Sequence, residues 1–339
     1  MKKFNVAVVG VGVVGTEMLK ILRERNFPAR DIKVLATRAR TEEIGGCQYQ
    51  VEPTTVESFE DVEIAFFAGT EGAKGASRQF GWPAVEKGTI VIDNGDDYRL
   101  DPRVPLVIPE VNAEHLKKHQ GFISNPNCST IQLAMALAPL HRRAGIKRVI
   151  VSTYQSVSGT GRAAIEELKA QTKAIGKETK AEVYPHKIAF NLFPEIGSLT
   201  DEFPGYYREE VKTIKEMRKI LGKPELPVSA TCVRVPVFIS HAEAVNVQFE
   251  EELSAGEARD ILRVSPGLKV LDEPRKSLYP VPLEVAGKDD VYIGRIREDH
   301  SAPHCLNLWV VGDNIRKGAA LNAVQIAEEM IKQGLISGS

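Results

Sequence analysis

A glycine-rich turn directly after the first apolar stretch is the feature that most limits the fold of this chain. Residues 4–9 are apolar and β-branched, residues 10–15 read G-x-G-x-x-G, and residues 16–25 carry apolar side chains at helical spacing. In this order of strand, turn and helix, glycines let the backbone approach a pyrophosphate at the helix N-terminus. The first part is therefore predicted to bind a dinucleotide; a plain strand-to-helix turn is the alternative.

The end of the second predicted strand indicates which dinucleotide. Residues 32–36 form this strand, and the following Thr37-Arg38-Ala39-Arg40-Thr41 contains no acid before Glu42. NAD sites commonly carry an acid here for the ribose 2′-hydroxyl, whereas arginines and hydroxyls suit a 2′-phosphate. We therefore expect NADP rather than NAD; two solvated surface arginines are the alternative.

Strands alternate with helical or loop segments through the rest of the first part. The further predicted strands are residues 64–68, 89–92, 106–108 and 122–124. This alternation predicts an α/β domain with a doubly wound, mostly parallel Rossmann-type sheet, whose ligands bind at the carboxyl ends of the strands. Polar turns at residues 69–72 and 93–95 fall at two such ends.

The second part has a different pattern. Alternating or β-branched runs occupy residues 147–154, 228–249, 291–296 and 306–311. Pro236 predicts an edge, bend or bulge within the second run. We expect an α+β domain with a mixed or antiparallel sheet, and a last helix, residues 319–335, that packs back on the first domain. The predicted domains are residues 1–127 with 318–339, which are expected to bind NADP, and residues 128–317, to which the resemblance given below assigns catalysis and dimerisation.

Composition excludes several classes of protein. The 339 residues are 43% apolar with a formal net charge of −1, so no basic excess points to nucleic acid or an anionic membrane surface. No segment has the roughly 18 apolar residues that a membrane span needs. Four widely spaced cysteines argue for a reducing, cytoplasmic setting without disulfides or a thiolate zinc site. His300 and His304 are four apart, but Pro303 breaks the helix that a metal-binding pair needs, so no metal is expected.

Cys128 is the candidate nucleophile. Asn127 before it is typical of a helix N-cap, and the apolar run after it predicts a helix to about Gly145. The first turn of a helix favours a thiolate through its free N–H groups and its dipole. Because Cys128 also follows the last predicted strand of the first sheet, we expect it beside the nicotinamide end of the cofactor. A small apolar residue buried at a helix start is the alternative.

Five strings give the chain a resemblance to a known family. They are residues 105–112, 125–132, 152–159, 229–236 with His241, and 309–320. In this order they resemble aspartate-semialdehyde dehydrogenase, in its bacterial NADP-dependent form, over essentially the whole chain. The resemblance implies NADPH-dependent, reversible reduction of L-4-aspartyl phosphate to L-aspartate 4-semialdehyde and phosphate, in lysine, threonine, methionine and diaminopimelate biosynthesis. It also implies a homodimer, or a tetramer, assembled through the second domain.

The resemblance implies three catalytic residues. Cys128 matches the nucleophile that forms a thiohemiacetal and then an acyl-thioester, His241 the acid–base residue, and Gln155 the residue that orients the intermediate. A thiolate suits this chemistry because its tetrahedral adduct can lose hydride and the resulting thioester keeps its acyl energy for transfer to phosphate. A histidine can exchange a proton near neutral pH.

Binding residues are implied in the same way. Arg234 matches the position that binds the substrate α-carboxylate, and Glu209 the one that faces its ammonium. Arg99 and Lys212 match phosphate-binding positions, which suits the paired hydrogen bonds that a carboxylate or phosphate accepts from arginine. The implied NADP contacts are Gly10, Gly12, Val13, Val14, Gly15, Thr37, Arg38, Arg40, Ser158, Gly159 and Asn314.

Two features leave alternatives open. Asn94-Gly95-Asp96-Asp97-Tyr98-Arg99 replaces the family's Asn-Ser-Ser-Ala-Phe-Arg, and two acids before Arg99 oppose anion binding if they point inward. By spacing alone, Glu209, Glu210 and Lys212 are expected on a solvated helix face. The alternatives are a related acyl-phosphate or acyl-CoA reductase, such as one for N-acetyl-glutamyl phosphate, and a non-catalytic paralogue that keeps the fold for binding.

Overall fold

The computed structural model describes residues 2–69, 75–176 and 178–336. The chain divides into two compact units, one formed by Met1–Asn127 with Ala319–Ser339 and the other by Cys128–Gly318. Of the polar turn expected after the strand at 64–68, residues 70–72 lie outside the described residues.

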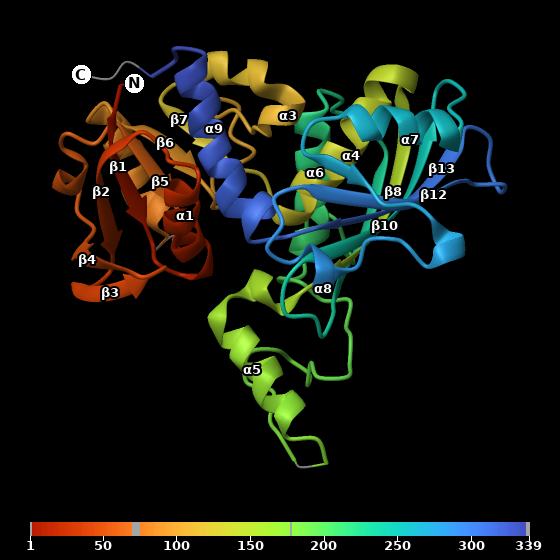
Figure 1. Ribbon diagram of the computed structural model, residues 1–339, viewed down its shortest axis with the longest axis horizontal. Coiled ribbons are helices and arrows are strands. Elements are labelled where there is room, and N and C mark those ends of the chain that lie inside the picture. Colours follow the sequence, from red (N-terminus) through yellow and green to blue (C-terminus); the bar gives the residue numbers. More distant parts are fainter. Residues whose placement is uncertain (1, 70–74, 177, 337–339) are drawn as a thin grey trace. The chain divides into compact units, whose positions relative to one another are not determined.

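Within the described residues, the first unit contains a seven-stranded sheet (Figure 1). In spatial order its strands are β3 (Arg40–Ile44), β4 (Cys47–Pro53), β2 (Ala29–Ala36), β1 (Phe4–Val9), β5 (Ile64–Phe67), β6 (Ile90–Asp93) and β7 (Phe122–Ser124). Neighbours run parallel except in the β3–β4 hairpin. The carboxyl ends of the parallel strands therefore meet at one edge.

Alternate side chains of β1 enter two separate cores. Val6 and Val8 pack with α1 (Val13–Glu24) and α9 (Leu321–Lys332), whereas Ala7 and Val9 face the opposite core. Because both faces are covered, the strand is an almost unbroken apolar run. The predicted packing of the last helix on the first domain is confirmed, since α9 contacts α1 and α3 (Pro109–Asn112). The short helix α2 (Trp82–Glu86) lies before β6.

The second unit is built on a mixed sheet, six-stranded within the described residues. In spatial order its strands are β11 (Leu268–Val270), β12 (Val291–Glu298), β13 (Cys305–Gly312), β10 (His241–Phe249), β8 (Ile146–Gln155) and β9 (Val228–Arg234). The helices are α4 (Cys128–Ala144), α5 (Arg162–Lys173), α6 (Arg208–Ile220), α7 (Ala255–Val264) and α8 (Pro282–Val285). Helices α4, α6 and α7 cover one face of the sheet (Figure 1). The predicted two-domain α/β architecture is thus confirmed.

The structure differs from the sequence predictions at three places. Residues 106–108 form no strand: Leu106 makes an isolated bridge to Ser124, and Pro109 then begins α3. The run 228–249 is two strands, and the bend that Pro236 predicts lies where residues 235–240 leave the ladder between β9 and β10. The short strands β3, β4 and β11 were not predicted, since β3 and β4 are rich in polar residues and β11 has only three residues.

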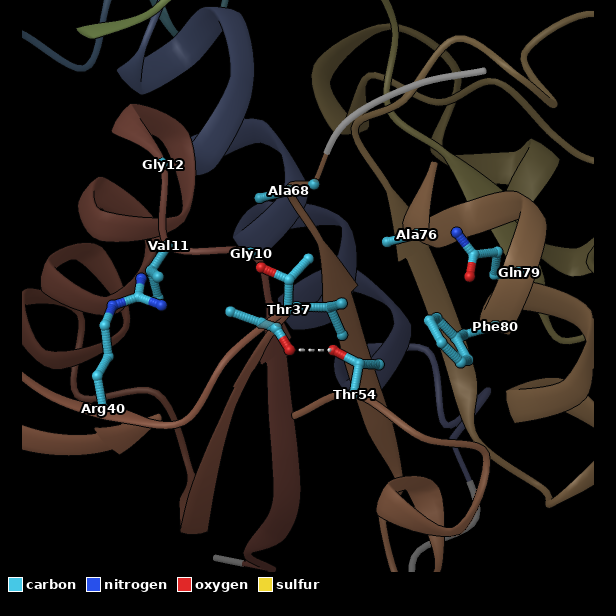
Figure 2. A pocket seen from close by; sticks show the side chains of 13 residues that line it. Gly10, Val11, Gly12, Thr37, Arg40, Thr54, Ala68, Ala76, Gln79 and Phe80 are labelled. Carbon is cyan, nitrogen blue, oxygen red and sulfur yellow. Dashed lines mark hydrogen bonds between the residues drawn. The ribbon is translucent and has the colours of Figure 1, made fainter. Parts of the chain in front are cut away.

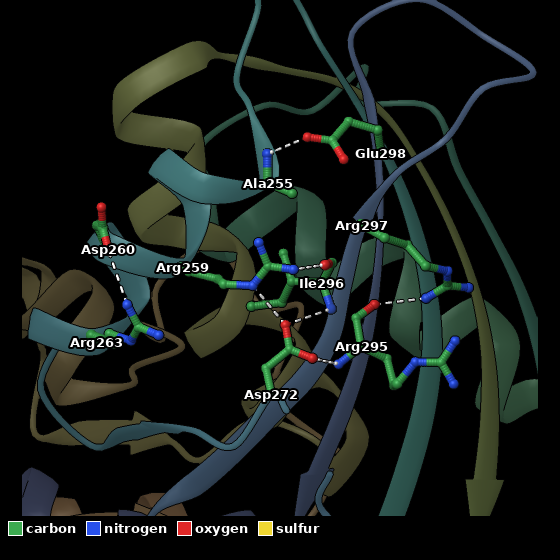
Figure 3. Close-up of polar contacts among 9 residues, drawn as sticks. All are labelled: Ala255, Arg259, Asp260, Arg263, Asp272, Arg295, Ile296, Arg297 and Glu298. Atoms are coloured by element: carbon green, nitrogen blue, oxygen red, sulfur yellow. Dashed lines mark hydrogen bonds and ion pairs between the residues drawn. The ribbon is translucent and has the colours of Figure 1, made fainter. Parts of the chain in front are cut away.

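A bulge in β12 is held by one carboxylate (Figure 3). Asp272 accepts from the backbone N–H of Arg295 at 2.7 Å, from that of Ile296 at 3.2 Å and from Arg259 Nε at 2.7 Å. Arg259 also donates to the Ile296 carbonyl. These bonds stabilise the left-handed Arg295, at φ 51°, and let the rest of β12 pair with β13.

Among the described residues, no helix combines the length and apolar character that crossing a membrane requires.

Candidate active site

Four strand ends of the second unit meet at one edge of its sheet. Gln155, the last residue of β8, pairs with Arg234, the last residue of the parallel strand β9. Strand β10 runs antiparallel to β8 and β13, so it begins where they end, and His241 pairs with Gly312. Three side chains predicted from sequence to act together therefore lie on neighbouring strands of the described chain.

His241 is fully buried, and one of its ring nitrogens is already bonded. Its Nδ1 accepts from the Ser156 backbone N–H at 3.0 Å and lies 3.1 Å from Ser156 Oγ. Burial, aided by the charge of Arg234, lowers the pKa of His241 to about 3, so the ring is neutral at physiological pH. Since Nδ1 accepts a hydrogen bond, the proton of the neutral ring sits on Nε2, which has no hydrogen-bond partner among the described residues.

Arg234 presents a second unsatisfied donor. The side chain is 4% exposed, its Nη1 donates to the Ser156 carbonyl at 2.5 Å, and its guanidinium lies 5.7 Å from the Tyr184 ring centroid. Its Nε is buried without a partner in the described structure. A Cβ added at Gly159 would lie 3.4 Å from both Arg234 Nη1 and His241 Nε2, so the glycine keeps space open beside both side chains. Buried donors around such a space suit a ligand that carries a carbonyl and an anionic group.

Gln155 is oriented from both sides. Its Nε2 donates to Glu209 Oε1 at 3.0 Å, and its Oε1 accepts from Thr153 Oγ1 at 3.1 Å. Lys212 Nζ lies 3.7 Å from the other oxygen of Glu209. These contacts fix which way the amide of Gln155 points.

The prediction of a solvated face on α6 was wrong for the two acids of that helix. Glu209 and Glu210 are buried, because α6 packs against β9, and Lys212 is half-buried. Glu210 accepts from the backbone N–H groups of Cys232 at 3.1 Å and Tyr207 at 2.8 Å, so it ties the start of the helix to the sheet.

Asn314 lies after the end of β13 and joins the turn that follows β8. Its Oδ1 accepts from the Ser240 backbone N–H at 2.9 Å, and its Nδ2 donates to Ser158 Oγ at 3.0 Å. Ser156 Oγ also donates to Oδ1 at 3.1 Å. Ser158 and Asn314, two of the implied cofactor contacts, are thus bonded to each other beside His241.

Cys128 is the first residue of α4, as the sequence predicts. It is half-buried, and Gly318 approaches it closely: a Cβ at position 318 would lie 3.0 Å from the Cys128 Cβ. Gly318, in the π-helical turn Arg316–Ala320, therefore packs closely against Cys128, and a larger side chain there would crowd it. A thiol in the first turn of a 17-residue helix has the environment that favours the thiolate.

In the first unit, the glycine turn forms a cradle. Gly10 has φ +99°, and a Cβ there would lie 2.8 Å from the Ala68 carbonyl oxygen; a Cβ at Gly15 would overlap the Gly10 carbonyl. A Cβ at Gly12 meets nothing within 4 Å, so its backbone is open to a ligand. Val13 and Val14 are the first two residues of α1, so their backbone N–H groups are among the free donors at the helix N-terminus.

A cavity of about 550 Å³ lies at this turn (Figure 2). Gly10, Val11 and Gly12 line it together with Thr37 and Arg40, and Figure 2 shows the Arg40 side chain on the side of Val11. A turn of glycines next to a hydroxyl and a guanidinium fits a dinucleotide whose adenosine end lies at β2.

The two arginines of this loop are not equivalent. Arg40 lines the cavity and pairs with Glu42 at 2.8 Å, with its side chain 41% exposed. Arg38 is exposed and is not among the residues that line the cavity. The structure therefore brings Arg40 to the candidate dinucleotide site.

Arg99 is buried in the first unit and held by the backbone. Its Nε donates to the Asn125 carbonyl at 2.9 Å and its Nη2 to the Asn94 carbonyl at 2.7 Å. Of the two acids that precede it, Asp97 pairs with Arg78 at 2.8 Å. A guanidinium that sequence spacing does not reveal thus compensates the charge of Asp97.

Several residues at the site were missed from sequence. Thr153, Ser156 and Tyr184 contact Gln155, His241 and Arg234 respectively, and only the first two lie in a recognised string. Ser156 acts largely through its backbone, which leaves no compositional signal. The relevant signal for Thr153 is its position two residues before Gln155, on the same face of β8.

Comparison with known proteins agrees over the whole chain. A family model described as semialdehyde dehydrogenase, NAD binding domain, matches residues 5–119, and one described as semialdehyde dehydrogenase, dimerisation domain, matches residues 137–317. Aspartate-semialdehyde dehydrogenase from Aquifex aeolicus (strain VF5) is 48% identical, with 98% of this chain and 99% of that protein covered; the protein of that name from Bacillus subtilis (strain 168) is 42% identical, with 98% and 99% covered.

Solved structures agree as well. The crystal structure of aspartate semialdehyde dehydrogenase II from Vibrio cholerae has a TM-score of 0.92 at 41% identity, with 98% of this chain and 99% of that chain covered. A second structure of that protein, described as complexed with ASA, has a TM-score of 0.92 at 40% identity and the same coverage.

Proposed function

This chain belongs to the aspartate-semialdehyde dehydrogenase family, and we propose that it catalyses the NADPH-dependent, reversible reduction of L-4-aspartyl phosphate to L-aspartate 4-semialdehyde and phosphate. Lysine, threonine, methionine and diaminopimelate biosynthesis would use the product. The observation that carries the proposal is the pair of buried donors at the strand ends near Gly159, since His241 Nε2 and Arg234 Nε have no hydrogen-bond partner among the described residues. The substrate named for the Vibrio cholerae complex has the carbonyl and carboxylate that such donors suit.

Cys128 would carry the acyl group. In the reductive direction its thiolate attacks the acyl carbon, the bond to the phosphate oxygen breaks, and phosphate leaves with the bonding electrons. Reduction of the resulting thioester gives a thiohemiacetal, whose C–S bond breaks to release the aldehyde and the thiolate. A bound nicotinamide supplies the hydride for that reduction, or accepts it in the oxidative direction.

His241 would act first on oxygen rather than on sulfur. With Nδ1 accepting from Ser156, the neutral ring offers Nε2–H to the carbonyl oxygen, where negative charge develops in the tetrahedral adduct. The acid–base role expected from sequence is retained at that oxygen. The start of α4 then has the main part in keeping Cys128 ionised.

Four side chains would bind the substrates, and a fifth would orient the acyl group. Arg234 pairs with the α-carboxylate and Glu209 with the α-ammonium, and Gln155, held by Glu209, orients the acyl group. Arg99 and Lys212 would bind phosphate. The pairing of Asp97 with Arg78 supports the assignment of Arg99, because it compensates one of the two acids whose charge opposes an anion there.

NADP would occupy the cavity at the glycine turn. Gly10, Gly12 and Gly15, with Val13 and Val14 at the helix start, would contact the pyrophosphate. Thr37 and Arg40 would contact the 2′-phosphate, with Arg38 as a more peripheral cation. Ser158, Gly159 and Asn314 would meet the nicotinamide end.

The second unit would form a homodimer, alone or within a tetramer. Along β10, the side chains of Ala244, Asn246 and Gln248 alternate with the buried ones and are half-exposed on the sheet face opposite α4. The matching domain model is described as a dimerisation domain, which supports assembly through this unit.

The function is tested by following NADPH formation from L-aspartate 4-semialdehyde, with NADP or NAD and with phosphate varied. We expect turnover that requires phosphate, prefers NADP and is lost in Cys128→Ala, with N-acetyl-glutamate semialdehyde a poor substrate. A well-folded preparation without turnover of aspartate semialdehyde would contradict the proposal.

A further inference from the structure

Glu243 is a fully buried carboxyl in the middle of the second sheet. It lies two residues after His241 and hence on the same face of β10, between Thr153 of β8 and Val310 of β13. Neither carboxyl oxygen has a hydrogen-bond partner, and Glu243 forms no ion pair, among the described residues. Burial raises the pKa of Glu243 well above its usual value, which favours the protonated carboxyl, whose O–H can donate a hydrogen bond.

Gln132 approaches this acid from the helix that carries Cys128. It lies one turn after Cys128 on α4, is 2% exposed, and has a buried Nε2 without a partner in the described structure. Its amide faces Glu243 closely enough to lower the pKa of that carboxyl, an effect smaller than that of burial. Its Oε1 lies 2.6 Å from where a Cβ at Gly312 would stand, and Gly312 pairs with His241. Gln132 therefore fills a space that exists because position 312 has no side chain.

Apolar packing alone would fill this interior at lower cost, since buried polar groups are unfavourable unless they are bonded. An amide and a protonated carboxyl are complementary, because each offers one donor and one acceptor to the other. Such a pair forms in a single alignment of the two elements, whereas apolar side chains tolerate sliding. The elements here are α4, which bears the nucleophile, and β10, which bears the histidine.

We propose that Gln132 and Glu243 form a hydrogen-bonded amide–acid pair that fixes α4 on β10 and so sets the position of Cys128 relative to His241. Both are positioning residues and contact neither substrate nor cofactor. The inference rests on the proposed function only in its kinetic consequence; the pair itself can be observed without turnover.

The pair is tested directly by infrared spectroscopy of the full-length protein at neutral pH. A carbonyl band of a protonated carboxyl is expected in the parent protein, absent in Glu243→Gln and shifted to higher frequency in Gln132→Met, where the hydrogen bond is lost. No such band, or a band that Gln132→Met leaves unshifted, would overturn the pair. The infrared test needs no substrate, so its result stays valid if aspartate semialdehyde proves not to be the substrate.

The positioning role is tested by exchanging the partners. Glu243→Met is expected to lower kcat about 100-fold with little change in KM for the semialdehyde, because misplacement of reacting groups by about 1 Å costs that much. The double variant Gln132→Glu/Glu243→Gln restores an amide–acid pair and is expected to recover to within about 10-fold of the parent kcat. Glu252→Met, at an exposed position beyond the end of β10, is the matched control and retains parent kcat.

An exchanged variant that is as slow as Glu243→Met, or a Glu243→Met variant with parent kcat, would overturn the role. Thermal unfolding of each variant shows that the compared proteins are folded. Should Glu243→Met not fold, Gln132→Met and the exchanged variant make the same comparison.

Discussion

Lowering the pH should destabilise the second unit through His241 by an amount that the structure fixes. Burial lowers the pKa of His241 from 6.5 to about 3 in the folded chain. The unfolded chain therefore binds the extra proton first, so this contribution is complete above pH 6.5 and is lost as the pH falls toward 3. Proton linkage between these two values gives a loss of about 3 kcal/mol between pH 7 and pH 4.

The measurement is urea unfolding of the parent and His241→Gln at pH 7, 5 and 4, at one fixed protein concentration. Trp309 fluorescence in a Trp82→Phe background reports the second unit, where Trp309 lies beside Tyr154. Other titrations, such as that of Asp93, whose pKa burial raises to about 6, are common to both proteins and cancel in the difference. The parent should lose about 3 kcal/mol more than the variant. Parallel losses would refute a neutral, buried histidine, and with it the donor role of Nε2–H.

Three further predictions concern binding. Gly159→Ala places a methyl group 3.4 Å from His241 Nε2 without backbone strain. The value of kcat/KM for the semialdehyde should therefore fall about 10- to 100-fold, while the free energy of unfolding stays unchanged. An unaffected kcat/KM would show that the substrate does not bind beside Gly159. Arg40→Ala should raise KM for NADP about 10-fold and leave KM for NAD unchanged, as two parallel cofactor titrations would show. Arg78→Ala should raise KM for phosphate about 5-fold, the equivalent of about 1 kcal/mol, and Arg78→Ala/Asp97→Asn should reverse this; no reversal would separate Asp97 from the phosphate site.

The parts of this molecule that were predictable from sequence are those set by short segments. The turn at Gly10 requires glycine for local steric reasons, and the start of α4 at Cys128 follows from an N-cap before an apolar run. Alternating or apolar runs likewise indicate β1, whose two faces are both covered, and β8, of which helices cover one face. Each of these structures is predicted by a sequence pattern that spans only about ten residues.

The parts that were not predictable depend on distant packing. The burial of Glu209 follows from the docking of α6 on β9, and its spacing alone looks like that of a solvated helix. Ser156 fixes the tautomer of His241 mainly with a backbone N–H, which every residue except proline carries. The neutralisation of Asp97 needs Arg78, 19 residues away, and no local rule pairs them.

The central claim, that Cys128 carries the acyl group, is tested most directly by mixing the protein with L-4-aspartyl phosphate in the absence of nicotinamide. The proposed chemistry predicts one aspartyl group added to Cys128, detected by intact-protein and peptide mass, with release of an equal amount of phosphate. The adduct should be cleaved by hydroxylamine, as a thioester is, and should be absent in Cys128→Ala. An adduct on another residue, or reduction of the acyl phosphate by Cys128→Ala once NADPH is added, would contradict the account.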